Sequence, residues 1–118
     1  MSKTKTIKPF EAFGGLPEVD VVTRGTAVVT KMTGNLNFLT PPVDLVGLKA
    51  DIDAVSALMA ESLDGSKKVI AEKKKQKDVV VKKLRLLGRY VEVTCKNDRA
   101  IFISSGFEPA SGSRAQKV

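Results

Sequence analysis

Residues 43–63 read VDLVGLKADIDAVSALMAESL, and their apolar side chains recur at alternating intervals of three and four. This spacing places the apolar side chains in one stripe along an α-helix, over nearly three heptads. We therefore predict a helix over residues 41–63, with Thr40 as its N-cap and Pro41-Pro42 in its first turn. Its apolar seam consists of Leu45, Leu48, Ile52, Val55, Met59 and the pair Ser62-Leu63.

The same pattern continues in a longer helix, predicted over residues 66–96. Asp64-Gly65 lies between the two helices as a tight turn, so we expect them to be antiparallel neighbours. Val69, Val81 and Leu86 are expected to widen the apolar face of this longer helix. Its seam consists of Ile70, Lys73, Lys77, Val80, Leu84, Leu87, Val91 and Thr94.

Two further helices complete an all-α, up-and-down helical bundle. The first is predicted over residues 17–33, with Pro17 in its first turn, although its β-branched stretch TAVVTKM also fits a strand. The other is short, over residues 98–105, with Asn97-Asp98 as break and N-cap and Gly106 at its C-terminal end. We expect Phe107 to return to the core.

The chain is predicted to divide into three parts. Residues 1–16 form an N-terminal arm, flexible or docked, residues 17–108 form the bundle, and residues 109–118 form a disordered tail or linker. Apolar side chains in the arm and in the loop before the second helix lie outside the helical pattern. They are the candidate protein-interaction residues: Ile7, Phe10 and Phe13 in the arm, and Leu36, Phe38 and Leu39 in the loop.

The residue inventory argues against catalysis. The 118 residues include no histidine and one cysteine, Cys95, so neither a Ser-His nor a Cys-His nucleophile pair can form within one chain. Cys95 is interpreted as a small buried apolar residue rather than as a thiol activated by Lys96 and Arg99. Asp51 and Asp53 point to different sides of a helix and do not indicate a metal site. We therefore predict no catalytic, cofactor-binding or metal-binding residues.

Positive charge is concentrated in the longest predicted helix. The formal net charge is +7, and the stretch AEKKKQKDVV at 71–80 carries four lysines within five positions. These four turn around the helix, whereas Lys75, Lys82, Arg85 and Arg89 follow one another at intervals of seven, three and four. They are the candidate anion or nucleic-acid face, although no aromatic side chain stands among the lysines to stack on bases.

Three interpretations of these basic residues remain open. The favoured one is a solvated helix face paired with the acidic second helix. The second is non-specific binding of nucleic acid, and the third is contact with a membrane surface, which the shortage of large apolar residues within the run disfavours. Lys73 and Lys77, on the seam itself, are interpreted as long side chains that reach water at the open end of the bundle, in preference to a register device or a docking site for an acidic partner.

Two stretches, MTGNLNFLTPPVDLVGL at 32–48 and LGRYVEVTCKNDRAIFISSGFEPAS at 87–111, resemble a family. It is a small helical module of uncharacterised bacterial proteins, in some of which the module precedes a fibronectin type III module. The resemblance implies a helical bundle, implies that a linker starts in the C-terminal tail, and implies no activity. This chain departs from the pattern because it has more lysine than alanine in the third predicted helix and no β-sandwich after the motif.

The sequence thus predicts a non-enzymatic structural or protein-interaction module that binds a protein partner or itself. The alternative is a basic accessory protein that binds nucleic acid non-specifically through the third predicted helix. We expect no small-molecule substrate and no membrane partner. Because no signal-peptide pattern and no run of membrane-spanning length occur, the expected location is the cytoplasm.

Overall fold

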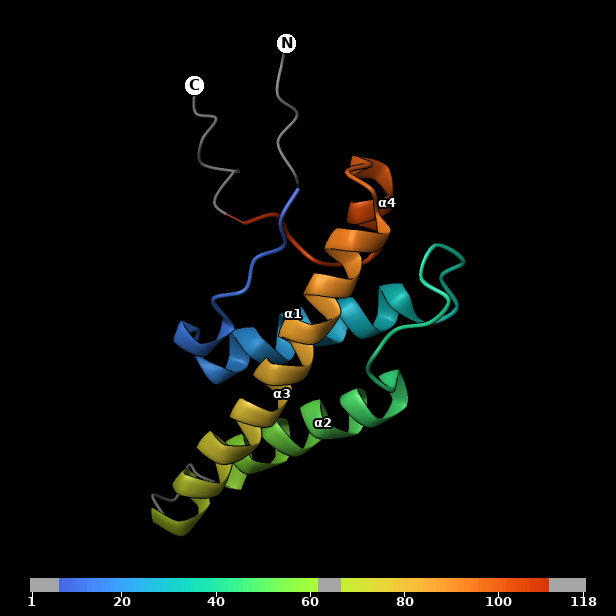
Figure 1. Cartoon of the computed structure of the whole chain (residues 1–118). Helices are drawn as coiled ribbons and strands as arrows, with labels where there is room; N and C mark the ends of the chain where they lie inside the picture. Colours follow the sequence, from blue (N-terminus) through green and yellow to red (C-terminus); the bar gives the residue numbers. More distant parts are fainter. Residues whose placement is uncertain (1–6, 62–66, 111–118) are drawn as a thin grey trace.

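The computed structural model describes residues 7–61 and 67–110, and within them every long element is an α-helix (Figure 1). Three longer helices pack against one another and a short helix follows them, which confirms the predicted all-α fold. The elements are η1 (Phe13–Gly15), α1 (Glu18–Met32), α2 (Leu45–Glu61), α3 (Lys67–Thr94) and α4 (Arg99–Ser104).

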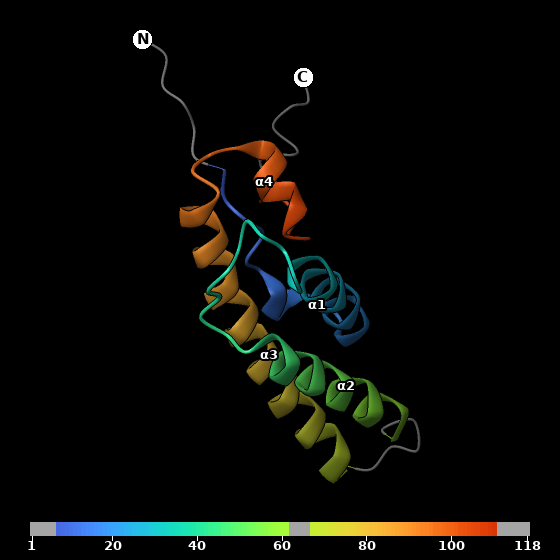
Figure 2. The ribbon, with the colours of Figure 1, turned by 90° about the vertical axis from the view of Figure 1, so that its right-hand side faces the viewer.

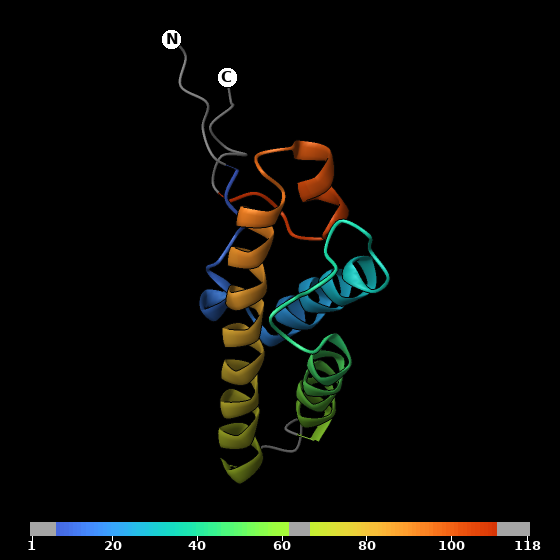
Figure 3. The same ribbon diagram turned by 45° about the vertical axis from the view of Figure 1, so that its right-hand side comes forward.

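The core lies where α1 and α2 meet α3. α2 runs back antiparallel to α3 and makes the most extensive helix contact with it, while α1 crosses α3 obliquely and also packs on α2 (Figure 3). The central part of the predicted seam between α2 and α3 is buried, where the apolar side chains of the two helices pack together. Its fully buried members are Leu48, Ile52 and Val55 of α2 and Val80, Leu84, Leu87 and Val91 of α3. Ile70, predicted as a seam residue near the start of α3, is instead 44% exposed, because it lies beyond the part of α3 that the other helices cover.

The segment from 26 to 32 is helical, so the alternative of a strand at TAVVTKM is wrong. Val21, Val28 and Met32 of α1 are all buried, and this 3.6-residue periodicity of burial overrides the weak helix propensity of β-branched residues. Gly25 lies at the crossing with α2, where an added Cβ would come within 2.8 Å of the Ile52 Cδ1 atom. The glycine therefore allows the close approach of the two helices.

α2 begins at Leu45, four residues later than predicted. Asp44 precedes it and satisfies its first amides: the carbonyl oxygen accepts from the Leu48 N–H at 2.9 Å, and Oδ2 accepts from the Gly47 N–H at 3.1 Å. Thr40 is therefore not the N-cap; its N–H instead donates to the Tyr90 hydroxyl at 3.1 Å. The prolines disfavour helix in the residues before them, which keeps this segment a loop. The predicted end of the helix at 63 and the turn at 64–65 lie outside the described residues.

α3 ends at Thr94, two residues before the predicted end at 96. The break and the cap that join it to α4 form as predicted. Lys96 and Asn97 have φ values of 49° and 64°, which break the helix after Thr94. The Asp98 carboxylate then caps α4 by accepting from the Ala100 and Ile101 amides. Gly106 has φ of 87° and turns the chain so that Phe107 re-enters the core, where it is buried.

Candidate functional site

The N-terminal arm is part of the domain core. Phe13 is 2% exposed, and its ring packs edge-to-face against Phe10 at 5.2 Å and against Phe107 at 6.4 Å between centroids. Ile7 and Phe10 are partly buried on the same cluster. Over residues 7–16 the arm is therefore docked, which is one of the two predicted alternatives. Packing within the chain buries Phe13, so that Phe13 cannot contact a partner, and covers Ile7 and Phe10 in part.

Backbone pairing also fixes the arm beside the segment that follows α4. Pro9 and Pro109 form an isolated antiparallel bridge. The Phe10 N–H donates to the Glu108 carbonyl at 2.8 Å, and the Ala110 N–H donates to the Lys8 carbonyl at 2.7 Å. The two ends of the described chain therefore lie side by side (Figure 2).

Two basic side chains of α3 bind the arm. Lys77 Nζ donates to the carbonyl oxygens of Leu16 at 2.5 Å and Gly14 at 3.3 Å. Arg85 Nε donates to the Glu11 carbonyl at 3.2 Å. Lys77 therefore holds the arm on α3 instead of reaching water at an open bundle end. Arg85 also contacts the arm, although its side chain stays exposed.

Other charged residues of α3 pair with neighbouring helices. Lys83 forms an ion pair with Asp51 of α2, and Lys73 reaches Glu18 of α1 at 3.9 Å. The predicted pairing of basic α3 with acidic α2 thus rests, within the described residues, on one ion pair.

Lys75, Lys82 and Arg89 remain as exposed cations on the outer side of α3. Within residues 7–61 and 67–110, no ion pair involves any of the three. Since they recur at intervals of seven, they share one face of the helix. Of the predicted anion face, these three cations lie on the outer side of α3, and Arg85 lies beside them where the arm meets the helix.

Hydrogen bonds and ring packing hold the loop between α1 and α2 on either side of two exposed leucines, Leu36 and Leu39. The Asn35 side-chain amide donates to the Lys31 and Ser104 carbonyls, and the Asn37 N–H donates to the Asn35 Oδ1 atom at 2.8 Å. Phe38 is buried and its ring lies 5.9 Å from that of Tyr90. Of the three predicted loop residues, Phe38 thus belongs to the core.

Leu36 and Leu39, in contrast, are 83% and 73% exposed. Leu39 lies between Phe38 and Thr40, both of which contact Tyr90 of α3. Leu86 and Val93, four residues before and three residues after Tyr90, are 51% and 75% exposed and lie beside it on the helix. We call this surface the Tyr90 patch; its members are Leu39, Leu86, Tyr90 and Val93.

Of the Tyr90 patch, only Leu39 was predicted as an interaction residue. Sequence reasoning missed Tyr90, and it also missed the pair Leu86 and Val93. Leu86 is exposed, which corrects the expectation that it widens the core face, and Val93 was not singled out. The available signal is their interval of seven residues, which places them on the same face as Lys82 and Arg89. That face is opposite the buried seam.

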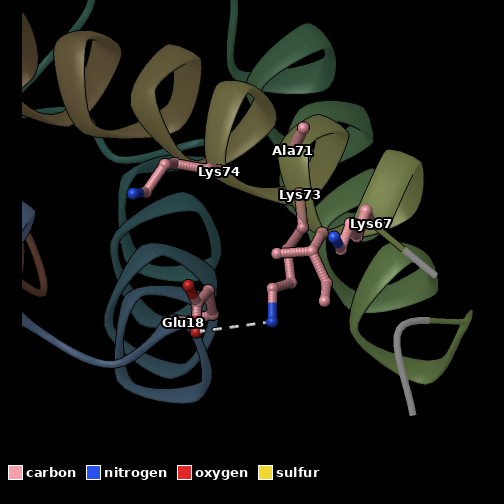
Figure 4. A pocket seen from close by; sticks show the side chains of 6 residues that line it. Glu18, Lys67, Ala71, Lys73 and Lys74 are labelled. Atoms are coloured by element: carbon pink, nitrogen blue, oxygen red, sulfur yellow. Dashed lines mark ion pairs between the residues drawn. The ribbon is translucent and has the colours of Figure 1, made fainter. Parts of the chain in front are cut away.

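A hollow of about 380 Å³ beside the lysine run is lined by Ile70, Ala71, Lys67, Lys73, Lys74 and Glu18. Lys73 extends from α3 toward Glu18 of α1, with which it forms an ion pair (Figure 4). None of the six is a cysteine, histidine or serine. Elsewhere, Cys95 is fully buried, as predicted, and its Sγ atom lies 3.6 Å from the Glu92 carbonyl oxygen.

Two searches of the described part of the chain give negative results. No cluster of three or more His, Cys, Asp or Glu side chains there could hold a metal ion. No helix there combines the length and the apolar character needed to cross a membrane. Neither known family models, nor curated proteins, nor solved structures give a match to this chain.

Proposed function

We propose that this protein is a non-enzymatic protein-interaction module that docks a partner, or a second copy of itself, on the loop surface formed by Leu36 and the Tyr90 patch. The observation that carries the proposal is that large apolar side chains are exposed on a loop that hydrogen bonds hold in place. Large apolar side chains gathered on an exposed surface are a feature of interaction sites.

The rigidity of the loop supports this function. Leu36 lies between Asn35 and Asn37, which bond to α1 and α4, and Leu39 lies between Phe38 and Thr40, which contact α3. Binding to a surface that is already ordered costs little conformational entropy. Simple solvation would favour polar residues at these positions.

Self-association is the form of this function that purified protein tests directly. Light scattering should show a mass that rises with concentration for the wild type and not for the double variant Leu36→Ser/Leu39→Ser. A photo-crosslinking residue at position 36 should form adducts that the same residue at exposed Ser56 of α2 does not form. A monomer at every concentration, with equal crosslinking at both positions in purified protein and in cell extract, would contradict the proposal.

Non-specific nucleic-acid binding is retained as a second candidate because Lys75, Lys82 and Arg89 are exposed cations without an ion-pair partner in the described residues. Neutralising phosphates with three cations gives weak, steeply salt-dependent binding. Fluorescence anisotropy with labelled duplex DNA and single-stranded RNA tests it. Binding that persists at physiological salt and is lost in Lys75→Glu/Lys82→Glu would favour this candidate over protein interaction.

A further inference from the structure

α3 carries a second heptad seam on its outer side, opposite the seam buried against α2. Its positions follow one another at intervals of four, three, four, three and four, the spacing of a helix that packs lengthwise on another helix. Apolar and basic residues alternate along it. The six positions are Lys75, Val79, Lys82, Leu86, Arg89 and Val93, which span about 27 Å of helix at 1.5 Å per residue.

Neighbouring elements border this outer seam without covering it. On one side the arm contacts α3 through Lys77 and Arg85; on the other side the loop contacts α3 through Tyr90. Between them Lys75, Lys82 and Arg89 are exposed, as are Leu86 and Val93, while Val79 is half-buried. The seam is therefore an exposed strip of surface that shares Leu86 and Val93 with the Tyr90 patch.

We propose that the outer seam of α3 binds an acidic amphipathic helix of a partner protein, about three heptads long, in coiled-coil fashion. Glutamates of the partner would face Lys75, Lys82 and Arg89, and its leucines would face Val79, Leu86 and Val93. This inference rests on the proposed function and specifies the partner.

The alternation of charge and apolar surface favours this occupant over others. Phosphate backbones would leave Leu86 and Val93 without a role, and three apolar residues form a narrower strip than a membrane-bound helix presents. A second copy of α3 would place cation against cation, which destabilises a heptad interface, and the chain as a whole carries +7. An acidic amphipathic helix offers carboxylates to the basic seam positions and apolar side chains to the apolar ones.

The test uses the full chain and a labelled synthetic peptide of three heptads with glutamate and leucine alternating at its seam positions. Fluorescence anisotropy at physiological salt should show saturable binding, and a scrambled peptide of the same composition should bind much more weakly. Lys82→Glu/Arg89→Glu and, separately, Leu86→Ser should each raise Kd by about tenfold. Circular dichroism would confirm that each variant keeps the helical content of the wild type.

The matched control is Lys31→Glu/Lys74→Glu, which makes the same change in net charge at exposed residues off the seam. Its Kd should change by less than about twofold. Equal weakening by both charge variants, equal binding of the scrambled peptide, or no saturable binding would overturn the inference. So would Leu86-dependent binding of anionic vesicles or single-stranded RNA without binding of the peptide.

The failure of this inference is distinguishable from failure of the proposed function. Self-association or crosslinking that depends on Leu36 and Leu39, with no peptide binding, would leave the interaction module standing and refute the acidic-helix partner. The absence of self-association, of position-specific crosslinking at residue 36 and of peptide binding would refute both.

Discussion

Replacing Phe13 with alanine is expected to lower the free energy of unfolding by about 3–4 kcal/mol. Full burial of a phenylalanine side chain contributes about 2–3 kcal/mol, and the two edge-to-face contacts with Phe10 and Phe107 add about 0.5–1.5 kcal/mol. The cavity left behind adds a further cost, which partial collapse of the terminal arm reduces, so the total falls in the range measured for such substitutions, about 3–5 kcal/mol.

Urea unfolding followed by far-ultraviolet circular dichroism measures this loss, because the chain has no tryptophan and one tyrosine but extensive helix. The melting temperature should fall by about 10–15 °C for a domain of this size. Leu36→Ala, at a side chain that is 83% exposed, is the control and should change the free energy by less than about 0.5 kcal/mol. A loss below about 1 kcal/mol for Phe13→Ala, with an unchanged urea m-value, would show that the arm is not part of the core.

Three other substitutions or reactions probe single features of the fold. Gly106→Ala should lower the free energy of unfolding in urea by at least about 2 kcal/mol, because φ is positive and the new Cβ would meet the Ala27 carbonyl oxygen at 2.7 Å. The control is Gly34→Ala, also at positive φ but with open space around it, which should lower it by only about 1 kcal/mol. Equal losses for the two variants would refute the close approach at Gly106. Asp98→Ala should cost about 1 kcal/mol through loss of the α4 cap, whereas an unchanged urea midpoint would show that the cap contributes nothing. Cys95, which is fully buried, should react with a thiol reagent only as fast as the protein unfolds, and rapid reaction in native buffer would contradict its burial.

Burial of the arm changes which residues can contact a partner. On the sequence, the arm and the loop were equivalent candidates because both contain apolar side chains outside the helical periodicity. In the structure, Phe13 completes the core and Phe38 packs near Tyr90, so only Leu36 and Leu39 remain exposed. An interaction surface therefore has to be built from the loop and the outer side of α3.

The sequence by itself determined the helices and their buried faces. The 3-4 spacing of apolar residues from Leu45 to Met59, and again from Val80 to Val91, predicts the α2–α3 seam because helical periodicity is a local property of the chain. The Asp98 cap and the Gly106 turn are equally local, since capping and positive φ depend on one or two residues. The start of α2 was missed because Thr40 and Asp44 are both good caps, and the contact of Thr40 with Tyr90 is not local.

Only the tertiary structure decided which side chains of α3 are contacted or covered by other segments of the chain. Arg85 and Arg89 look equivalent on the sequence, but the arm, 74 residues earlier, supplies a carbonyl to Arg85 alone. Leu86 looks like a core residue until the packing of α1 and α2 fixes which side of α3 is covered. Such assignments depend on which segments meet in space, and residue periodicity within one helix carries no information about that.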